Sequence, residues 1–119
     1  SPAMNMLEGE VRSTGTGLEL DIGQTSLALP AMSALKEGQK IIAGIRPEDL
    51  TPSETGILAK IAVIEPTGSE THLLLRGNDQ DLTSVLRERR NYSPGQDIYL
   101  SADPDTLHIF DSQSKQRLH

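Results

Sequence analysis

The chain of 119 residues contains no cysteine and no tryptophan, and it has only three aromatic side chains. The lack of cysteine excludes disulfide bridges, thiol catalysis and metal sites built from thiolates. The aromatic residues are Tyr92, Tyr99 and Phe110. We therefore expect a hydrophobic core of Leu, Ile, Val, Ala and Met. Few aromatic rings also count against a surface that stacks the bases of single-stranded nucleic acid.

Basic charge and long apolar runs are scarce as well. The formal net charge is −6, from 17 acidic and 11 basic residues. A surface that follows nucleic-acid phosphates needs an excess of Lys and Arg. No apolar run approaches the roughly 18 residues of a membrane span, and residues 1–5 lack the features of a secretion signal. Because Ser1 stands where an initiator Met would, we expect the sequence to be a piece of a longer protein.

The sequence does contain many short runs in which apolar and polar residues alternate, separated by small turn residues. The clearest run is 57–63, where Ile57, Ala59, Ile61 and Val63 share one face. Further strands are predicted over 4–11, 18–22, 27–29, 40–45, 71–76, 82–90, 98–102 and 107–110. Short helical turns are expected at 31–36 and after Pro47. The pattern predicts one all-β domain over residues 1–119, a barrel of short antiparallel strands without exposed edges.

Motifs that could carry catalysis or bind a metal are weak in this sequence. The glycines do not fit the spacing of a phosphate-binding loop. Residues 103–111 contain carboxylates and an imidazole, but Asp-Pro-Asp at 103–105 is typical of a turn. Residues 69–72 contain a hydroxyl, a carboxylate and an imidazole, but a strand would place Ser69 and His72 on opposite faces. We interpret 87–90 as a solvated loop or strand end, and we predict no catalytic residue, cofactor or metal site in this chain.

The segment Gly44-Ile45-Arg46-Pro47-Glu48 predicts a sharp corner. A residue that precedes proline is driven out of the helical region, so Arg46 is expected to be extended. Pro47 suits the first position of a helical turn. The segment resembles the Gly-Ile-Arg-Pro-Glu signature in the C-terminal domain of the ATPase subunits of maltose-type importers.

Three further segments resemble the same family in the same order. Residues 1–7 are similar to its Ser-Pro-x-Met-Asn-Phe-Leu segment, residues 63–71 to Val-Val-Glu-x-Leu-Gly-x-Glu-Thr, and residues 105–111 to the closing His-Leu-Phe-Asp. Met6, Pro66 and Ile109 depart from the family pattern. The signature residues, which are also candidate interface residues, are Gly44, Arg46, Pro47, Glu48, Gly68, Glu70, His108 and Phe110.

The resemblance implies an OB-type barrel known as a TOBE domain, joined to an ATPase domain that binds ATP and Mg²⁺ outside this sequence. In the family, two such subunits form a homodimer, contact membrane permease subunits at the cytoplasmic face and receive regulatory proteins. The imported substrates are sugars, polyols or glycerol phosphates. A regulatory and dimerisation domain without enzyme activity is thus implied. The alternatives are a TOBE module that binds a small oxyanion and a nucleic-acid-binding OB barrel.

Phe110 raises a separate question about packing. Ile109 and Phe110 are adjacent in a predicted strand, so they cannot both enter the same barrel interior. Contact with a second copy of the chain across a two-fold axis is one way to cover Phe110, and the family resemblance favours it. The alternative, which the residues alone favour equally, is that a local helix or the tail, residues 113–119, covers the ring.

The missing phosphate-binding loop leads to a first testable prediction. We expect the isolated chain to show no appreciable binding of Mg-ATP, because it has no Gly-rich loop with its lysine to hold the phosphates. Titration calorimetry measures this directly, and a micromolar affinity would contradict the prediction.

Overall fold

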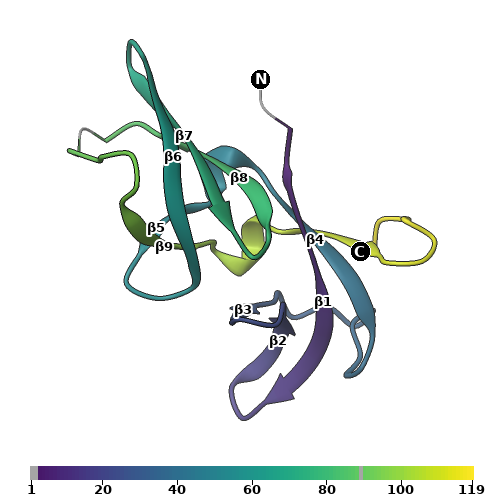
Figure 1. The fold of residues 1–119 in the computed structure, drawn as a ribbon. Helices are drawn as coiled ribbons and strands as arrows, with labels where there is room; N and C mark the ends of the chain where they lie inside the picture. Colours follow the sequence, from purple (N-terminus) through teal and green to yellow (C-terminus); the bar gives the residue numbers. More distant parts are fainter. Residues whose placement is uncertain (1–2, 89) are drawn as a thin grey trace. The chain divides into compact units, whose positions relative to one another are not determined.

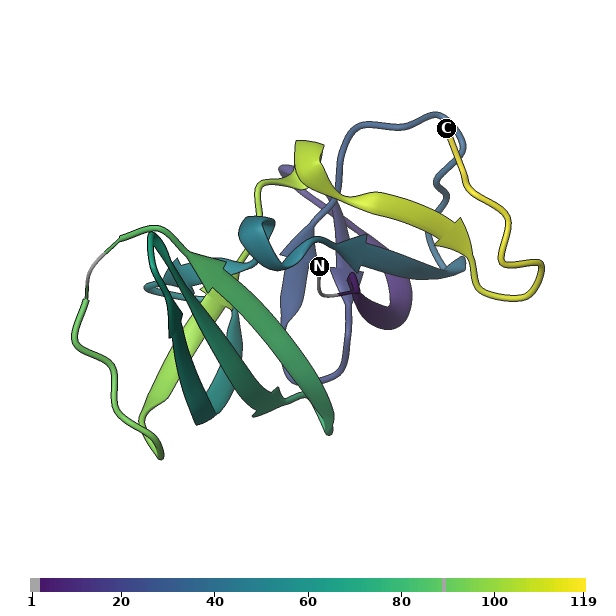
Figure 2. The same cartoon turned by 90° about the horizontal axis from the view of Figure 1, so that it is seen from above.

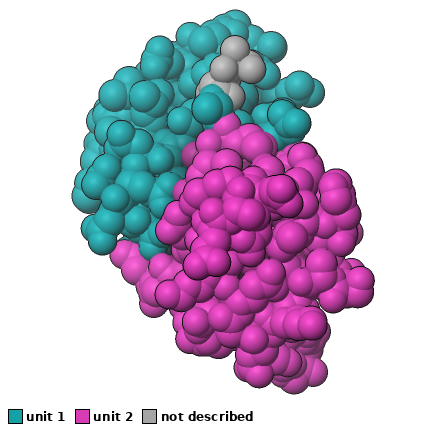
Figure 3. Space-filling model, turned by 90° about the vertical axis from the view of Figure 1, so that its right-hand side faces the viewer, with its two compact units in different colours: residues 1–3, 46–101 teal, residues 4–45, 102–119 magenta. Residues whose placement is uncertain are grey.

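The regular structure of the chain is almost entirely antiparallel β-strand (Figure 1). The computed structural model describes residues 3–88 and 90–119. The chain divides into two compact units, which Figure 3 shows in different colours. One contains residues 46–101, the other residues 4–45 and 102–119, and each contains a five-stranded sheet. The all-β prediction is confirmed, whereas the single domain over 1–119 stays a prediction.

The unit of residues 4–45 and 102–119 is built around one long strand. Its strands are β1 (Asn5–Thr14), β2 (Gly17–Asp21), β3 (Ser26–Ala28), β4 (Lys40–Ile45) and β10 (His108–Asp111). They lie in the order β10-β4-β1-β2-β3. The first half of β1 pairs with β4 and its second half pairs with β2. The N-terminal and C-terminal parts of the sequence thus share one sheet, in which β10 pairs with β4.

The core of this unit follows from the sequence pattern. Leu7 and Val11 of β1 are fully buried, while Glu8 and Arg12 point outward. All residues from Ile41 to Ile45 are buried. This explains why the sequence of β4 is a continuous apolar run and does not alternate.

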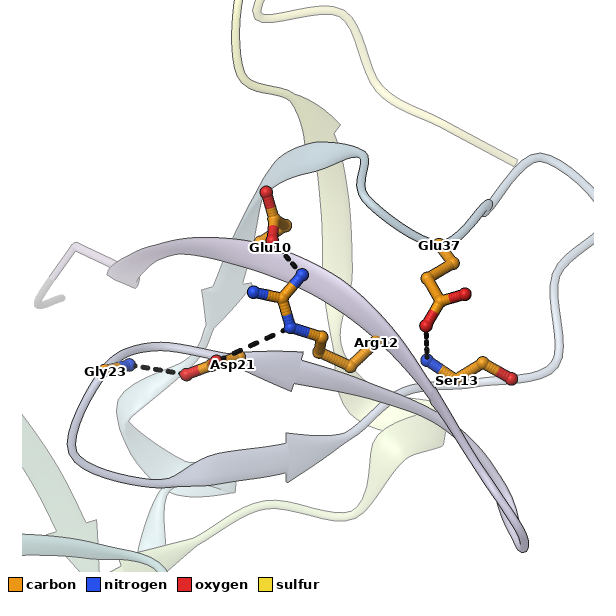
Figure 4. A network of polar contacts seen from close by, with 6 residues as sticks. All are labelled: Glu10, Arg12, Ser13, Asp21, Gly23 and Glu37. Atoms are coloured by element: carbon orange, nitrogen blue, oxygen red, sulfur yellow. Dashed lines mark hydrogen bonds and ion pairs between the residues drawn. The ribbon is translucent and has the colours of Figure 1, made fainter.

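A polar network covers the outer face beside β1 (Figure 4). The guanidinium of Arg12 lies between the carboxylates of Glu10 and Asp21, with its Nε 3.7 Å from Oδ2 of Asp21. Asp21 also accepts a hydrogen bond from the amide of Gly23 at 2.9 Å. The paired side chains are 31–47% exposed, so we ascribe only about 0–1 kcal/mol to each ion pair.

The unit of residues 46–101 is also built around one long strand. Its strands are β5 (Thr51–Ser53), β6 (Ile57–Thr67), β7 (Glu70–Gly77), β8 (Gln80–Leu86) and β9 (Asp97–Ser101). They lie in the order β5-β9-β6-β7-β8. β6 pairs with β9 on one side and with β7 on the other. β6, β7 and β8 form the meander seen from teal to green in Figure 2.

A β-bulge in β6 corrects one sequence prediction. Ile57, Ala59 and Ile61 are buried as expected, but Val63 is 45% exposed. The pairing with β7 shifts between Ile61 and Val63. Because the bulge inserts one residue, Ala62, it reverses the alternation beyond it, so the predicted place of Val63 on the buried face is wrong.

The helical turns also differ in part from expectation. The structure has two single 3₁₀ turns, η1 (Pro47–Asp49) and η2 (Pro104–Thr106). Residues 31–36 contain a β-turn with one bond from the Leu35 amide to the Met32 carbonyl, so the helical turn predicted there is wrong. β8 ends at Leu86, which makes the strand predicted for 82–90 too long. Within the described part of the chain, no helix is long and apolar enough to cross a bilayer.

Gly9 yields a prediction about the stability of the sheet around β1. A Cβ at this position would collide with the backbone carbonyl of Asp21 and lie 2.8 Å from Cδ1 of Leu20. We expect Gly9→Ala to lower the free energy of unfolding by about 1–3 kcal/mol, the typical cost of overpacking. Urea unfolding measures the change. Gly15→Ala is the matched control, because nothing lies within 4 Å of its added Cβ. Equal stability of the two variants would contradict the prediction.

Candidate functional site

The corner after β4 has the predicted conformation. Arg46 is extended, with φ −64° and ψ 147°, and Pro47 begins η1. The turn is closed by a hydrogen bond of 2.9 Å from the Asp49 amide to the Arg46 carbonyl. Pro47 is buried, whereas Arg46 and Glu48 are exposed. The signature therefore contains one side chain that anchors the corner and two charged ones that face solvent.

A buried hydrogen bond ties this corner to β8. The hydroxyl of Ser84 donates to the carbonyl of Leu50 at 2.5 Å. Ser84 and Leu50 are both fully buried. The bond satisfies two polar groups that would otherwise be costly in the core, and it fixes the distance between the corner and the edge of the sheet.

A cavity of about 470 Å³ opens next to the corner, within the unit of residues 46–101. Its walls combine charged, hydroxyl-bearing and apolar side chains. The lining residues are Glu48, Thr51, Pro52, Val85, Leu86, Arg87, Glu88, Arg90 and Tyr92. Residues 48–52 and 85–92 are far apart in sequence, so the cavity exists only because β5 and β8 belong to the same folded sheet.

Ion pairs hold most of the charges around this cavity. Nε of Arg90 lies 3.3 Å from Oε2 of Glu88, and Nε of Arg87 lies 3.7 Å from Oε2 of Glu70. The other oxygen of Glu70 lies 3.5 Å from Nε2 of His72. Of the predicted site residues, Glu48 thus lines the same cavity as Arg87, and Glu70 is the ion-pair partner of Arg87.

The structure shows where the basic run, residues 87–90, and the Ser-Glu-Thr-His segment, residues 69–72, lie. Arg87, Glu88 and Arg90 are exposed and follow the end of β8, as expected, while Arg89 lies outside the described residues. The sequence did not indicate that this run lines a cavity. Glu70 and His72 share a face of β7, as predicted, and the imidazole contacts the carboxylate.

Two predicted positions have structural roles in turns. Gly68 adopts φ +73° in the turn between β6 and β7, a conformation that favours glycine. Asp103 accepts a hydrogen bond of 2.9 Å from the amide of Asp105 and so caps η2. The interpretation of 103–105 as a turn is confirmed. Among the described residues, no group of three or more His, Cys, Asp or Glu side chains is placed to hold a metal ion.

The end of β10 shows what covers Phe110 within one chain. Ile109 is 2% exposed and enters the core, whereas Phe110 is half-buried. The guanidinium of Arg117 lies 5.7 Å from the centre of the Phe110 ring, within the range of a cation–π contact, and it also contacts Nδ1 of His108. The tail therefore partly covers the ring. A contact of Phe110 with a second copy stays a prediction.

Backbone hydrogen bonds fasten the tail to β10. The Asp111 amide donates to the Gln116 carbonyl and the Leu118 amide donates to the Ile109 carbonyl, both at 2.8 Å. The carboxylate of Asp111 accepts bonds from the amides of Ser114 and Gln113, at 2.8 and 3.1 Å. These bonds, above all that from Ser114, lower the pKa of Asp111 below its ordinary value.

Comparison with known proteins gives two family matches. A model of the MalK OB fold domain matches residues 1–50, and a model of the TOBE domain matches residues 43–110. An uncharacterized ABC transporter ATP-binding protein of Sinorhizobium fredii is 36% identical over 118 residues, which cover 99% of this chain and 32% of that protein. The sn-glycerol-3-phosphate import ATP-binding protein of Escherichia coli O157:H7 is 33% identical over 123 residues, covering 99% and 34%. The chain thus spans about a third of the length of these relatives.

The lowered pKa of Asp111 predicts how the tail responds to acid. A carboxylate whose pKa is depressed by folding stabilises the folded form above its unfolded pKa, and this stabilisation is lost as the pH falls through the folded value. We expect the pairing of residues 116–118 with β10 to loosen at acidic pH. Amide hydrogen exchange at Leu118, compared by NMR across the acidic range, measures the effect.

Two variants make this test specific. Asp111→Ala should speed exchange at Leu118 already at neutral pH, because the amides of Ser114 and Gln113 lose their acceptor. Asp79→Asn, in the exposed turn after β7, is the control and should change nothing in the tail. Equal opening of the tail in wild type and Asp111→Ala at neutral pH would refute the role of this carboxylate.

Proposed function

Because this chain belongs to the TOBE domain family, we propose that it is the non-catalytic regulatory and dimerisation part of an ABC importer's ATP-binding subunit. The observation that carries the proposal is the pair of overlapping family matches, which together extend over residues 1–110. The OB-type fold class predicted from the sequence is confirmed by the same matches. A phosphate-binding loop joins a strand to a helix, whereas the described residues form strands and two short 3₁₀ turns.

The proposal assigns the chemistry to the rest of the subunit. The relatives are about three times as long as this chain, which leaves room for an ATPase domain that binds ATP and Mg²⁺. In this proposal the complete subunit forms a homodimer and contacts the membrane permease subunits through that domain. It would lie at the cytoplasmic face of the membrane and receive a regulatory protein.

The substrate class follows from the same resemblance. The Escherichia coli relative is named for the import of sn-glycerol 3-phosphate. We propose sugars, polyols or glycerol phosphates as the imported class. Among the predicted interface residues, His108 and Phe110 on β10 remain candidates for contact between two copies, because both side chains are only half-buried.

A domain exchange tests the proposed role. This chain would replace the aligned third of the Escherichia coli sn-glycerol-3-phosphate import ATP-binding protein, and a shortened form of that protein would lack the same third. We expect the chimera to dimerise and to support uptake in cells without the native subunit. The shortened subunit should bind ATP but dimerise at least tenfold more weakly, a difference of about 1.4 kcal/mol.

Sedimentation and uptake assays distinguish the outcomes. Equal self-association of the chimera and the shortened subunit would defeat the dimerisation role. A matched chimera with Phe110→Ser reports whether the β10 surface takes part. Unchanged association of that folded variant would remove Phe110 from the interface but leave the role of the domain intact.

A further inference from the structure

The cavity beside η1 has the size of a small-molecule site. Its volume of about 470 Å³ lies within the range of roughly 300–1,000 Å³ that is usual for ligand pockets. Pro52, Val85 and Leu86 contribute apolar surface to its lining. A site of this kind holds a ligand with an aliphatic frame and positions it by a few polar groups.

The charges of the lining indicate which class of ligand fits. The lining contains two carboxylates, of Glu48 and Glu88, and two guanidinium groups, of Arg87 and Arg90. The formal charges of these four residues sum to zero. Both arginines already have a carboxylate within 4 Å. A phosphate or another oxyanion would have to compete with those carboxylates and would approach Glu48. Within the described lining, the balance of charge therefore argues against the oxyanion site that the sequence left as an alternative.

A ligand that carries hydroxyl groups fits the same lining, because it adds no charge to the cavity. A hydroxyl donates one hydrogen bond to a carboxylate and accepts others from guanidinium N–H groups. Among the described residues, Glu48 has no ion-pair partner within 4.0 Å. Its carboxylate can therefore accept hydrogen bonds from a ligand without giving up a bond to the protein.

Tyr92 supplies an independent observation at the same place. Its hydroxyl oxygen is buried and has no hydrogen-bond partner among the described residues. A buried polar group without a partner is costly, and each such case in a folded protein requires an explanation. A ligand hydroxyl in the cavity would provide the missing partner. Tyr92 lines the cavity, so a shift of its own side chain would bring this oxygen to a ligand bound there.

We propose that this cavity binds a small, neutral, polyhydroxylated molecule, a monosaccharide or a short polyol. Glu48 accepts hydrogen bonds from its hydroxyl groups, Arg87 and Arg90 donate to them, and Tyr92 bonds to a further hydroxyl. The apolar side chains of Pro52, Val85 and Leu86 pack against its C–H groups. This inference goes beyond the proposed function and does not rest on it, since it derives from the cavity alone and is tested on the isolated chain.

An NMR titration of the isotopically labelled chain tests the proposal. The probes are glucose and sorbitol, with inorganic phosphate and glycine at equal ionic strength as the anionic and zwitterionic alternatives. We expect saturable shifts with glucose or sorbitol at the amides of Thr51, Val85, Leu86 and Tyr92. A cavity in the other unit, lined by residues 8–10 and 21–23 with Lys40 and Ser112, is an internal control and should not respond. Saturation by phosphate or glycine alone, or by no probe, would overturn the proposal.

Two conservative variants locate the contacts. Tyr92→Phe removes only the hydroxyl and should weaken binding about tenfold, the typical effect of one hydrogen bond. Its melting temperature should equal or exceed that of the wild type, because an unpartnered polar group is lost. Tyr99→Phe is the matched control, since Tyr99 is 44% exposed on β9.

Glu48→Gln, at an exposed position, should also weaken binding without unfolding the chain. Unchanged affinity in both Tyr92→Phe and Glu48→Gln would refute the assignment.

Discussion

In each unit the structure depends on one long strand, which must pair with a different neighbour along each of its two edges. β1 bonds with β4 and β2, and β6 bonds with β9 and β7. Strands twist, so a strand of ten or eleven residues cannot keep ideal pairing with flat neighbours along both edges. The chain relieves this conflict by local means. Gly9 admits the close approach of the Asp21 carbonyl to β1, and a bulge after Ile61 bends β6.

The two sheets share a pattern of pairing that the residues themselves do not reveal. In each, the long strand is followed by two strands in a meander, and a fourth strand returns to pair on its other edge. A short fifth strand, β10 or β5, then pairs with the fourth. No internal repeat is visible in the sequence, because strand pairing requires alternating apolar residues and turns at suitable intervals but no particular side chains. Similar topology therefore arises here without detectable similarity between the two halves.

Local features of the fold could be predicted from the sequence because their causes are local. Proline restricts the residue before it, so Pro47 alone was sufficient to predict an extended Arg46 and a turn after it. The burial of Ile57, Ala59 and Ile61 followed from alternation. The bulge at Ala62 could not be predicted in this way, since no glycine or proline indicates its position. The cavity was also unpredictable, because its walls come from segments that only the tertiary fold brings together. Nothing in the sequence indicates that the hydroxyl of Tyr92 is buried.

The fold explains why some residues of the signature 44–48 have the identity that they have, and it does not explain others. Gly44 is buried where a Cβ would press on the side chain of Met4, and Pro47 is buried at the start of η1. The carbonyl of Ile45 accepts a hydrogen bond from the buried side chain of Asn5. The charges of Arg46 and Glu48 have no comparable purpose, because both side chains are exposed and neither forms an ion pair among the described residues. Exposed charges need no partner in the fold, because water solvates them, so these two side chains do not determine the conformation of the corner. Glu48 lines the cavity and Arg46 does not, so of the two only Glu48 can take part in the proposed binding of a small ligand.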